Sequence, residues 1–185
     1  MHGSIFVLLK RFVETTHDFS AWQKMLEDAG IPEKQFEVTE AYPDEEMFKL
    51  VDEATILTGL ERDALYEKFG EFLVPDLLMV YNRYIDPNWK TMDMLEHTEG
   101  TMHAAVRTED KNTDPPVLHV TRLHPNKLTI DYYSKRKMGG LAVGIIRGIA
   151  RYYNEADSIA IEAIKSQDGE RVQIRVTQTE NPEVV

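Results

Sequence analysis

The pattern of apolar residues changes at one short segment, Asp114-Pro115-Pro116. Proline has no backbone N–H, so two successive prolines are not compatible with the interior of a helix. Before this segment apolar residues recur at steps of three and four, which is typical of helices. After it, short apolar runs are separated by turn residues, which is typical of strands. This change of period predicts an α+β fold, with a helical lobe followed by a sheet.

Helices are expected before the break at residues 5–13, 20–30, 44–58, 61–69 and 89–106. Gly59 and Gly70 are placed to end two of them, because glycine adopts the left-handed conformation that often follows a helix. The apolar run at residues 72–80 contains Pro75, which is tolerated only in the first turn of a helix or at a kink. We therefore expect the fourth helix to stop at Gly70.

The second half predicts a four-stranded antiparallel sheet with one inserted helix. Strands are expected at residues 117–120, 128–133, 158–164 and 172–177, and the helix at 140–154. Asp168-Gly169 between the last two strands is typical of a hairpin turn. We expect one domain over residues 1–185, with a helical subdomain at about 1–60 and a second subdomain at about 61–185.

Composition excludes several classes of function. The net charge of −11 repels the phosphate backbone, so nucleic acid is not an expected partner. The chain has no cysteine, which excludes disulfides, iron–sulfur clusters, thiolate zinc sites and cysteine-ligated haem. The apolar stretch at residues 5–9 is too short to span a bilayer and has no signal-peptide flanks, so we expect a cytoplasmic protein without membrane contact. No acid–base–nucleophile set converges, which argues against an enzyme.

Two features of the sequence could bind a ligand. His103 follows Met102 and precedes Ala104 and Ala105, so small neighbours leave space beside its ring. A histidine on an apolar helix face is more often a packed core residue, and that alternative stays open. The segment Tyr132-x-Ser134-x-Arg136 would place two hydroxyls and a guanidinium on one side of an extended chain, where they could bind an anion. An ordinary solvated strand edge is the alternative.

Together these features resemble the H-NOX family, the haem nitric oxide/oxygen-binding domain that is also the sensor of soluble guanylate cyclase. The resemblance covers nearly the whole chain. It includes the Met-x-Gly opening, the helical first half, the histidine, the Pro115-Pro116 pair, the Tyr-x-Ser-x-Arg motif and the C-terminal hairpin. The motif alone is short, but its combination with the upstream histidine and the element order is specific.

The resemblance implies a role for each of these residues. His103 would be the axial ligand of the iron in haem b (iron protoporphyrin IX), which would lie between the two lobes. Tyr132, Ser134 and Arg136 would hold the haem propionates. Pro116 matches the proline that distorts the porphyrin in this family. The zinc site of some relatives is excluded, because it requires cysteine.

The side of the haem opposite the histidine decides which gas binds. Family members that bind oxygen stably carry a tyrosine five residues after the motif arginine, and Leu141 occupies that position here. Leu9 and, approximately, Leu73 match the two polar partners of that tyrosine. We therefore expect an apolar wall that lacks a hydrogen-bond donor for oxygen. Its expected members are Ile5, Leu9, Leu73, Leu141 and Ile145.

These implications predict a sensor of nitric oxide that excludes oxygen, with carbon monoxide as a further candidate ligand. Gas binding would release His103 and change a surface that a separate partner reads, by resemblance a histidine kinase or a cyclic-dinucleotide enzyme. Two alternatives stay open. The chain could be a haem-free protein-interaction module, or it could be a haem sensor that binds oxygen.

Overall fold

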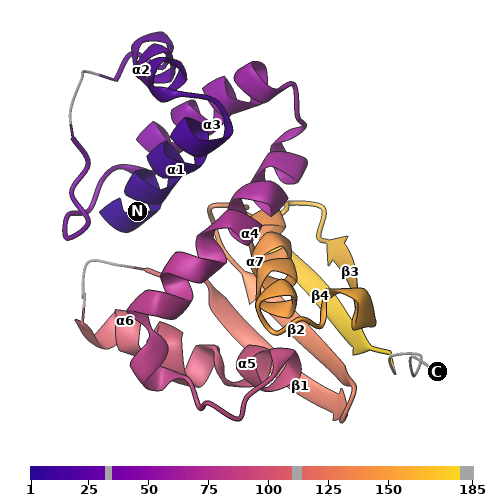
Figure 1. Cartoon of the computed structure of the whole chain (residues 1–185). Coiled ribbons are helices and arrows are strands. Elements are labelled where there is room, and N and C mark those ends of the chain that lie inside the picture. The colour runs from indigo at the N-terminus through magenta and orange to yellow at the C-terminus, as the bar shows by residue number, and fades with distance from the viewer. Residues whose placement is uncertain (32–34, 110–113, 180–185) are drawn as a thin grey trace. The chain divides into compact units, whose positions relative to one another are not determined.

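A computed structural model describes residues 1–31, 35–109 and 114–179 (Figure 1). The chain forms two compact units. Residues 1–65 make up most of the N-terminal unit, and residues 66–109 with 115–179 form the C-terminal unit. Within the described ranges, no helix combines the length and the apolar character needed to cross a membrane.

The N-terminal unit is helical and packs around aromatic rings. Its helices are α1 (Gly3–Thr16), α2 (Phe19–Asp28) and α3 (Asp44–Thr58). Phe6 stacks on Phe36 at 4.6 Å between ring centroids, and Trp22 and Tyr42 meet the same Phe36 ring edge-on. Burial of large aromatic side chains is the main stabilising contribution in a unit of this size. Helix α3 has the predicted bounds, with three acids in its first turn and Gly59 in the left-handed conformation after its end.

Helix α2 begins earlier than its sequence pattern indicates. Asp18 is the N-cap, and its carboxylate accepts hydrogen bonds from the backbone N–H of Ala21 at 2.8 Å and from the hydroxyl of Ser20 at 2.6 Å. The predicted start at Ser20 is therefore wrong by one residue, because the helix begins at Phe19. A carboxylate is as good a cap as a hydroxyl, so local sequence does not distinguish Asp18 from Ser20 as the N-cap.

Helix α4 (Arg62–Val80) runs through both Gly70 and Pro75, so the predicted stop at Gly70 is wrong. The reason is packing against α7 (Gly139–Tyr152). A Cβ at Gly70 would lie 2.3 Å from the carbonyl oxygen of Leu141, so glycine is needed here for close approach and not for a turn. Pro75 leaves the carbonyl of Glu71 without its helical donor.

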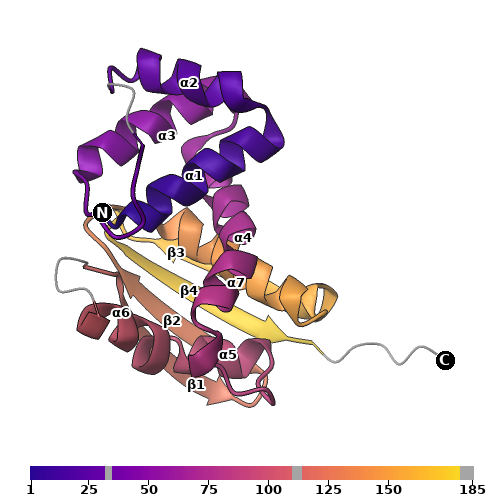
Figure 2. The same cartoon turned by 60° about the vertical axis from the view of Figure 1, so that its left-hand side comes forward.

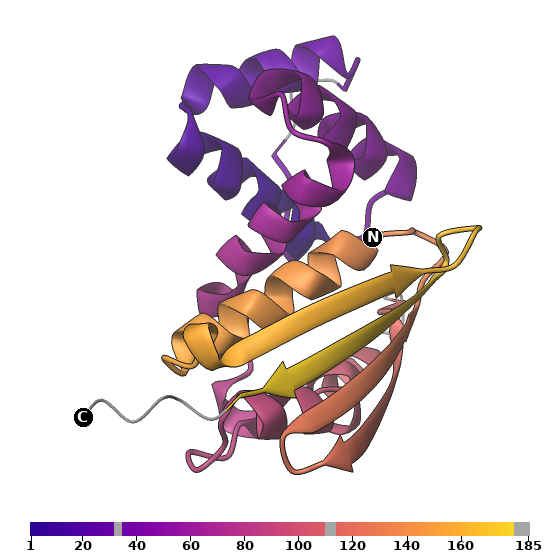
Figure 3. The ribbon, with the colours of Figure 1, turned by 90° about the vertical axis from the view of Figure 1, so that its right-hand side faces the viewer.

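The C-terminal unit contains a four-stranded antiparallel sheet in the order β1-β2-β4-β3 (Figure 3). The strands are β1 (Val117–His124), β2 (Lys127–Tyr133), β3 (Ile159–Lys165) and β4 (Arg171–Gln178). The central pair has Ile130 opposite Ile174. The predicted α+β class, the four strands and the inserted helix α7 are confirmed. Strand β1 is longer than predicted and extends to His124.

One face of this sheet is covered by helices. Helix α7 lies over β3 and β4, whereas α5 (Thr91–His97) lies over β1 and β2 (Figure 2). Alternate residues of the strands point into this layer, as the period of two requires. The buried core is formed by Val74, Leu78, Met92, Met94, Leu95, Met102, Leu128, Ile130, Tyr132, Val143, Ile146, Ile149, Val172, Ile174 and Val176. The opposite face carries polar side chains, including an Asp131–Arg171 ion pair at 2.7 Å.

Further short helical segments lie in the C-terminal unit. They are the short turns η1 (Asn82–Tyr84) and η3 (Ala156–Ser158), and helix α6 (Ala104–Glu109). Between α5 and α6 the chain forms a π-helical turn, η2 (Glu99–His103). The predicted single helix at residues 89–106 is thus three segments, because a π turn inserts one extra residue into the helical path.

Candidate functional site

His103 is the last residue of the π-helical turn η2. Its backbone N–H donates to the carbonyl of Thr98 at 3.1 Å. Thr98 is five residues earlier, whereas in an α-helix the acceptor is the carbonyl four residues earlier. Single π turns inside helices are rare and frequently mark functional sites. The backbone therefore departs from an ordinary α-helix at His103, the candidate metal-binding residue.

One ring nitrogen of His103 is held by a carboxylate. Nδ1 lies 2.8 Å from Oε2 of Glu99, four residues earlier, and the His103 side chain is 19% exposed. The backbone carbonyl of Pro116 also lies near the His103 ring and acts to raise its pKa, less strongly than the Glu99 carboxylate does. His103 and Pro116 thus lie near each other, and their roles toward a haem stay predictions. The structure adds Glu99, which the sequence analysis did not single out.

The electrostatics favour a neutral imidazole beside an ionised carboxylate. Burial lowers the pKa of His103 and outweighs its hydrogen bond to Glu99, which acts in the opposite direction. Burial alone would raise the pKa of Glu99. Hydrogen bonds from His103 and Arg107 outweigh it and hold that pKa below its usual value. With Glu99 ionised, Nδ1 carries the proton and donates it, so Nε2 bears the lone pair that a metal ligand needs.

This donor chemistry fits a haem iron ligand. Histidines that bind metals almost always donate their other ring N–H to a carboxylate, a carbonyl or water, and the Glu99–His103 pair has this arrangement. Among the residues that the structure describes, no three His, Asp or Glu side chains gather to hold a bare metal ion. A single neutral imidazole suits a haem, because the porphyrin itself supplies four of the iron ligands.

Tyr132, Ser134 and Arg136, the predicted propionate row, lie at and just after the end of β2. Tyr132 is buried on the inner face of the sheet, and its hydroxyl hydrogen-bonds to the side chain of Ser134. Burial raises the pKa of Tyr132, so the phenol stays protonated and can donate. The Ser134 hydroxyl oxygen also accepts the backbone N–H of Arg136 at 3.2 Å.

The row is built by a turn and not by strand alternation. Strand β2 ends at Tyr133, and the chain turns at residues 135–136, with the backbone N–H of Lys137 donating to the carbonyl of Ser134 at 3.1 Å. The expectation that an extended backbone aligns all three side chains is therefore wrong. Short-range hydrogen bonds centred on Ser134 organise this segment instead. Propionate binding by the three residues stays a prediction.

The apolar residues of the predicted wall belong to both units. Leu73, Leu141 and Ile145 lie in the C-terminal unit on α4 and α7, which approach closely at Gly70 and Gly144. Leu73 is fully buried, whereas Leu141 and Ile145, one helical turn apart, are half-buried. Ile5 and Leu9 lie in the N-terminal unit on α1, where Leu9 is buried and Ile5 half-buried. The shared wall stays a prediction.

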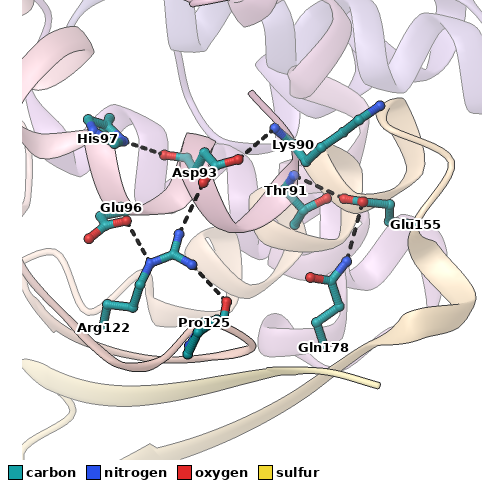
Figure 4. Close-up of polar contacts among 9 residues, drawn as sticks. All are labelled: Lys90, Thr91, Asp93, Glu96, His97, Arg122, Pro125, Glu155 and Gln178. Carbon is teal, nitrogen blue, oxygen red and sulfur yellow. Dashed lines mark hydrogen bonds and ion pairs between the residues drawn. The ribbon is translucent and has the colours of Figure 1, made fainter. Parts of the chain in front are cut away.

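His97, the other histidine of this helical segment, has a separate role. Its Nδ1 lies 2.8 Å from the carbonyl of Asp93 (Figure 4), and its ring stacks on Trp89 at 4.6 Å between centroids. The side chain is exposed. His97 thus packs on the surface of α5.

Arg122 on β1 anchors the helix that leads to His103. Its guanidinium bonds Glu96 at 2.7 Å, Asp93 at 3.2 Å and the carbonyl of Pro125 at 2.7 Å (Figure 4). At the start of α5, the backbone N–H of Thr91 donates to Glu155 at 3.0 Å. The sequence analysis missed these anchors, since charges on different elements carry no local signal of their pairing. The spacing of four between Glu99 and His103 is the one signal in the sequence that could have indicated their contact.

Comparisons with known proteins identify the family and the fold of this chain. The model of the Haem-NO-binding family (HNOB) matches residues 2–161. No curated protein matches the chain. Among solved structures, the unliganded Fe(II) H-NOX protein from K. algicida superposes with a TM-score of 0.85 at 21% identity, covering 100% of each chain.

Two further structures have the same fold. The H-NOX protein from S. oneidensis in the Fe(II)NO ligation state gives a TM-score of 0.85 at 18% identity, covering 97% of this chain and 100% of that one. A mutant of the H-NOX protein from T. tengcongensis gives 0.84 at 20%, covering 99% and 100%. The family match spans most of the sequence, and the fold agrees over its full length. The chain therefore belongs to the haem-NO-binding, or H-NOX, family of haem-based gas sensors.

Proposed function

We propose that this protein senses nitric oxide at ferrous haem b held by His103, that it excludes oxygen, and that it signals to a separate protein. The observation that carries the proposal is the His103 ring, mostly buried and held through Nδ1 by Glu99 on a π-helical turn. This is the arrangement expected of an axial histidine. Tyr132, Ser134 and Arg136 would hold the propionates, and Pro116 would press on the porphyrin from beside His103.

The exclusion of oxygen rests on what Leu141 lacks. Oxygen on ferrous iron carries partial negative charge and is stabilised by a hydrogen-bond donor, whereas nitric oxide binds ferrous haem tightly without one. Leu141 stands where oxygen-binding relatives carry a tyrosine. Leu73 and Ile145 from the same pair of helices are apolar as well. This set of side chains offers no O–H or N–H group to a bound gas.

The signal would originate in the segment that carries His103. Haem held by His103 would supply the iron that binds the gas, and gas binding there would weaken the hold on His103. His103 would leave the iron, and the π-helical turn could then relax, because a π turn is a less favourable conformation than an α-helix. Since α5 is fixed to β1 by Arg122, the movement would pass into α6 and the segment at Pro116. A ligand that favours one of two conformations in this way is sufficient for a switch. A histidine kinase or a cyclic-dinucleotide enzyme is the proposed reader.

Absorption spectra of the purified ferrous protein test the proposal. We expect a Soret band, a shift of that band on addition of nitric oxide, and no change in air on the timescale of the measurement. A colourless protein that does not take up hemin would favour a haem-free interaction module. A stable spectrum of the oxygen complex in air would overturn the assignment of Leu141.

The variant His103→Gly identifies the ligand. It should lose haem during purification and regain a ferrous spectrum when free imidazole is supplied, because imidazole can fill the space left by the side chain. His97→Gly is the matched control, since it removes a histidine from the same helical segment and should keep its haem. Unchanged ferrous spectra in His103→Gly would refute the ligand assignment.

A further inference from the structure

Glu99 connects three elements through one carboxylate. Oε2 accepts from Nδ1 of His103 at 2.8 Å and from the backbone N–H of Leu118 on β1 at 3.2 Å. Oε1 lies 2.5 Å from Nη2 of Arg107 on α6. The Glu99 side chain is 26% exposed, and its bonds to His103 and Leu118 are partly buried, whereas its bond to Arg107 is exposed. Donors from different elements thus compete for the charge of a single group.

A carboxylate that accepts a hydrogen bond from Nδ1–H changes the electron density at Nε2, the other ring nitrogen. Hydrogen bonds to an ionised acceptor are roughly twice as strong as those to a neutral one. The stronger this bond, the more electron density the imidazole offers at Nε2, so outer carboxylates raise the basicity of a metal-bound histidine. Arg107 opposes the effect, because its guanidinium draws charge from the same carboxylate.

We infer that Glu99 is a positioning residue that sets the strength of the bond between His103 and the haem iron. Arg107 weakens this effect of Glu99. The inference rests on the proposed function. A stronger bond resists release of His103 when nitric oxide binds, so the Glu99–Arg107 balance determines how readily the sensor switches. The backbone N–H of Leu118 donates to the same Oε2 atom, so Glu99 also links His103 to the start of β1.

Resonance Raman spectroscopy of the ferrous, unliganded protein measures this bond through the iron–histidine stretching frequency. Glu99→Gln keeps the shape and a carbonyl acceptor but removes the charge, so the frequency should fall. Arg107→Gln leaves the carboxylate to His103 alone, so the frequency should rise. Haem affinity should drop about 10- to 100-fold in Glu99→Gln, the usual range for outer-shell partners. With nitric oxide, Glu99→Gln should release His103 in a larger fraction of molecules than the wild type.

Glu96→Gln is the matched control. Like Glu99, Glu96 links a helical segment to β1, but its carboxylate bonds Arg122 and not His103. This variant should leave the stretching frequency unchanged. Equal shifts in Glu96→Gln and Glu99→Gln would mean that loosening of the helix is the cause, and would overturn the inference. If Glu99→Gln fails to fold, Arg107→Gln decides alone, since its predicted shift has the opposite sign.

The outcomes separate the two proposals. A wild-type protein without an iron–histidine stretch would overturn the proposed function and the inference together. A normal wild-type stretch that neither Glu99→Gln nor Arg107→Gln moves would overturn the inference and leave the proposed function intact.

Discussion

The crossing of α4 and α7 provides a sharp test of the packing argument. At Gly144 on α7, an added Cβ would lie 2.0 Å from the carbonyl oxygen of Glu67 and 2.7 Å from its carbonyl carbon. Ordinary contacts begin at 3.4 Å. The obstructing atoms are helix backbone and cannot rotate aside as a side chain would. Gly144→Ala must therefore push the two helices apart by more than an ångström.

Two opposing effects determine the magnitude. Alanine favours a helix over glycine by about 1 kcal/mol. Overpacking typically costs about 1–3 kcal/mol, and a clash with backbone belongs at the upper end of that range or above it. We expect a net loss of about 2 kcal/mol in the free energy of unfolding. For a chain of this length, that corresponds to a fall in Tm of about 4–8 °C.

Urea denaturation followed by circular dichroism measures this loss. Gly100→Ala is the matched control, because a Cβ at Gly100 would meet nothing within 4 Å and its φ lies outside the left-handed region. It should be neutral or gain up to about 1 kcal/mol from propensity alone. If Gly144→Ala is as stable as Gly100→Ala, the two helices do not approach as described and the reasoning fails.

Two other substitutions test the remaining arguments. Leu141→Tyr should add a donor and give the ferrous protein an oxygen complex that the wild type does not form, measured by absorption spectra in air; the absence of that complex would show that a donor at this position is not sufficient. Asp131→Asn should cost about 0.2–1 kcal/mol at pH 7, because a hydrogen bond from Arg171 holds the pKa of this surface carboxyl below its usual value. A group with a depressed folded pKa stabilises above its unfolded value of about 3.9, so the cost should vanish as the pH falls through that value and below. A pH-independent cost would show that charge is not its source.

Much of the fold was predictable because its causes are local. The pair Pro115-Pro116 ends the helical half wherever the chain folds, and alternation of apolar residues with a turn at Asp168-Gly169 specifies a hairpin. Helix α3 was predicted to the residue, since acids at its start and Gly59 at its end are both short-range signals. Gly70 was misinterpreted for the same reason. A glycine that ends a helix and a glycine that admits a neighbouring helix look alike until the neighbour is known.

The sequence by itself determined the order of the elements, the α+β class and the choice of His103 as the candidate ligand. These follow from periodicity, from turn chemistry and from a motif that can be read along the chain. Only the tertiary structure decided how His103 is held. The π-helical turn, the carboxylate of Glu99 and the competition from Arg107 depend on the packing of η2, α6 and β1. A carboxylate binds whichever donors the fold places within about 3 Å, and no local pattern specifies that distance.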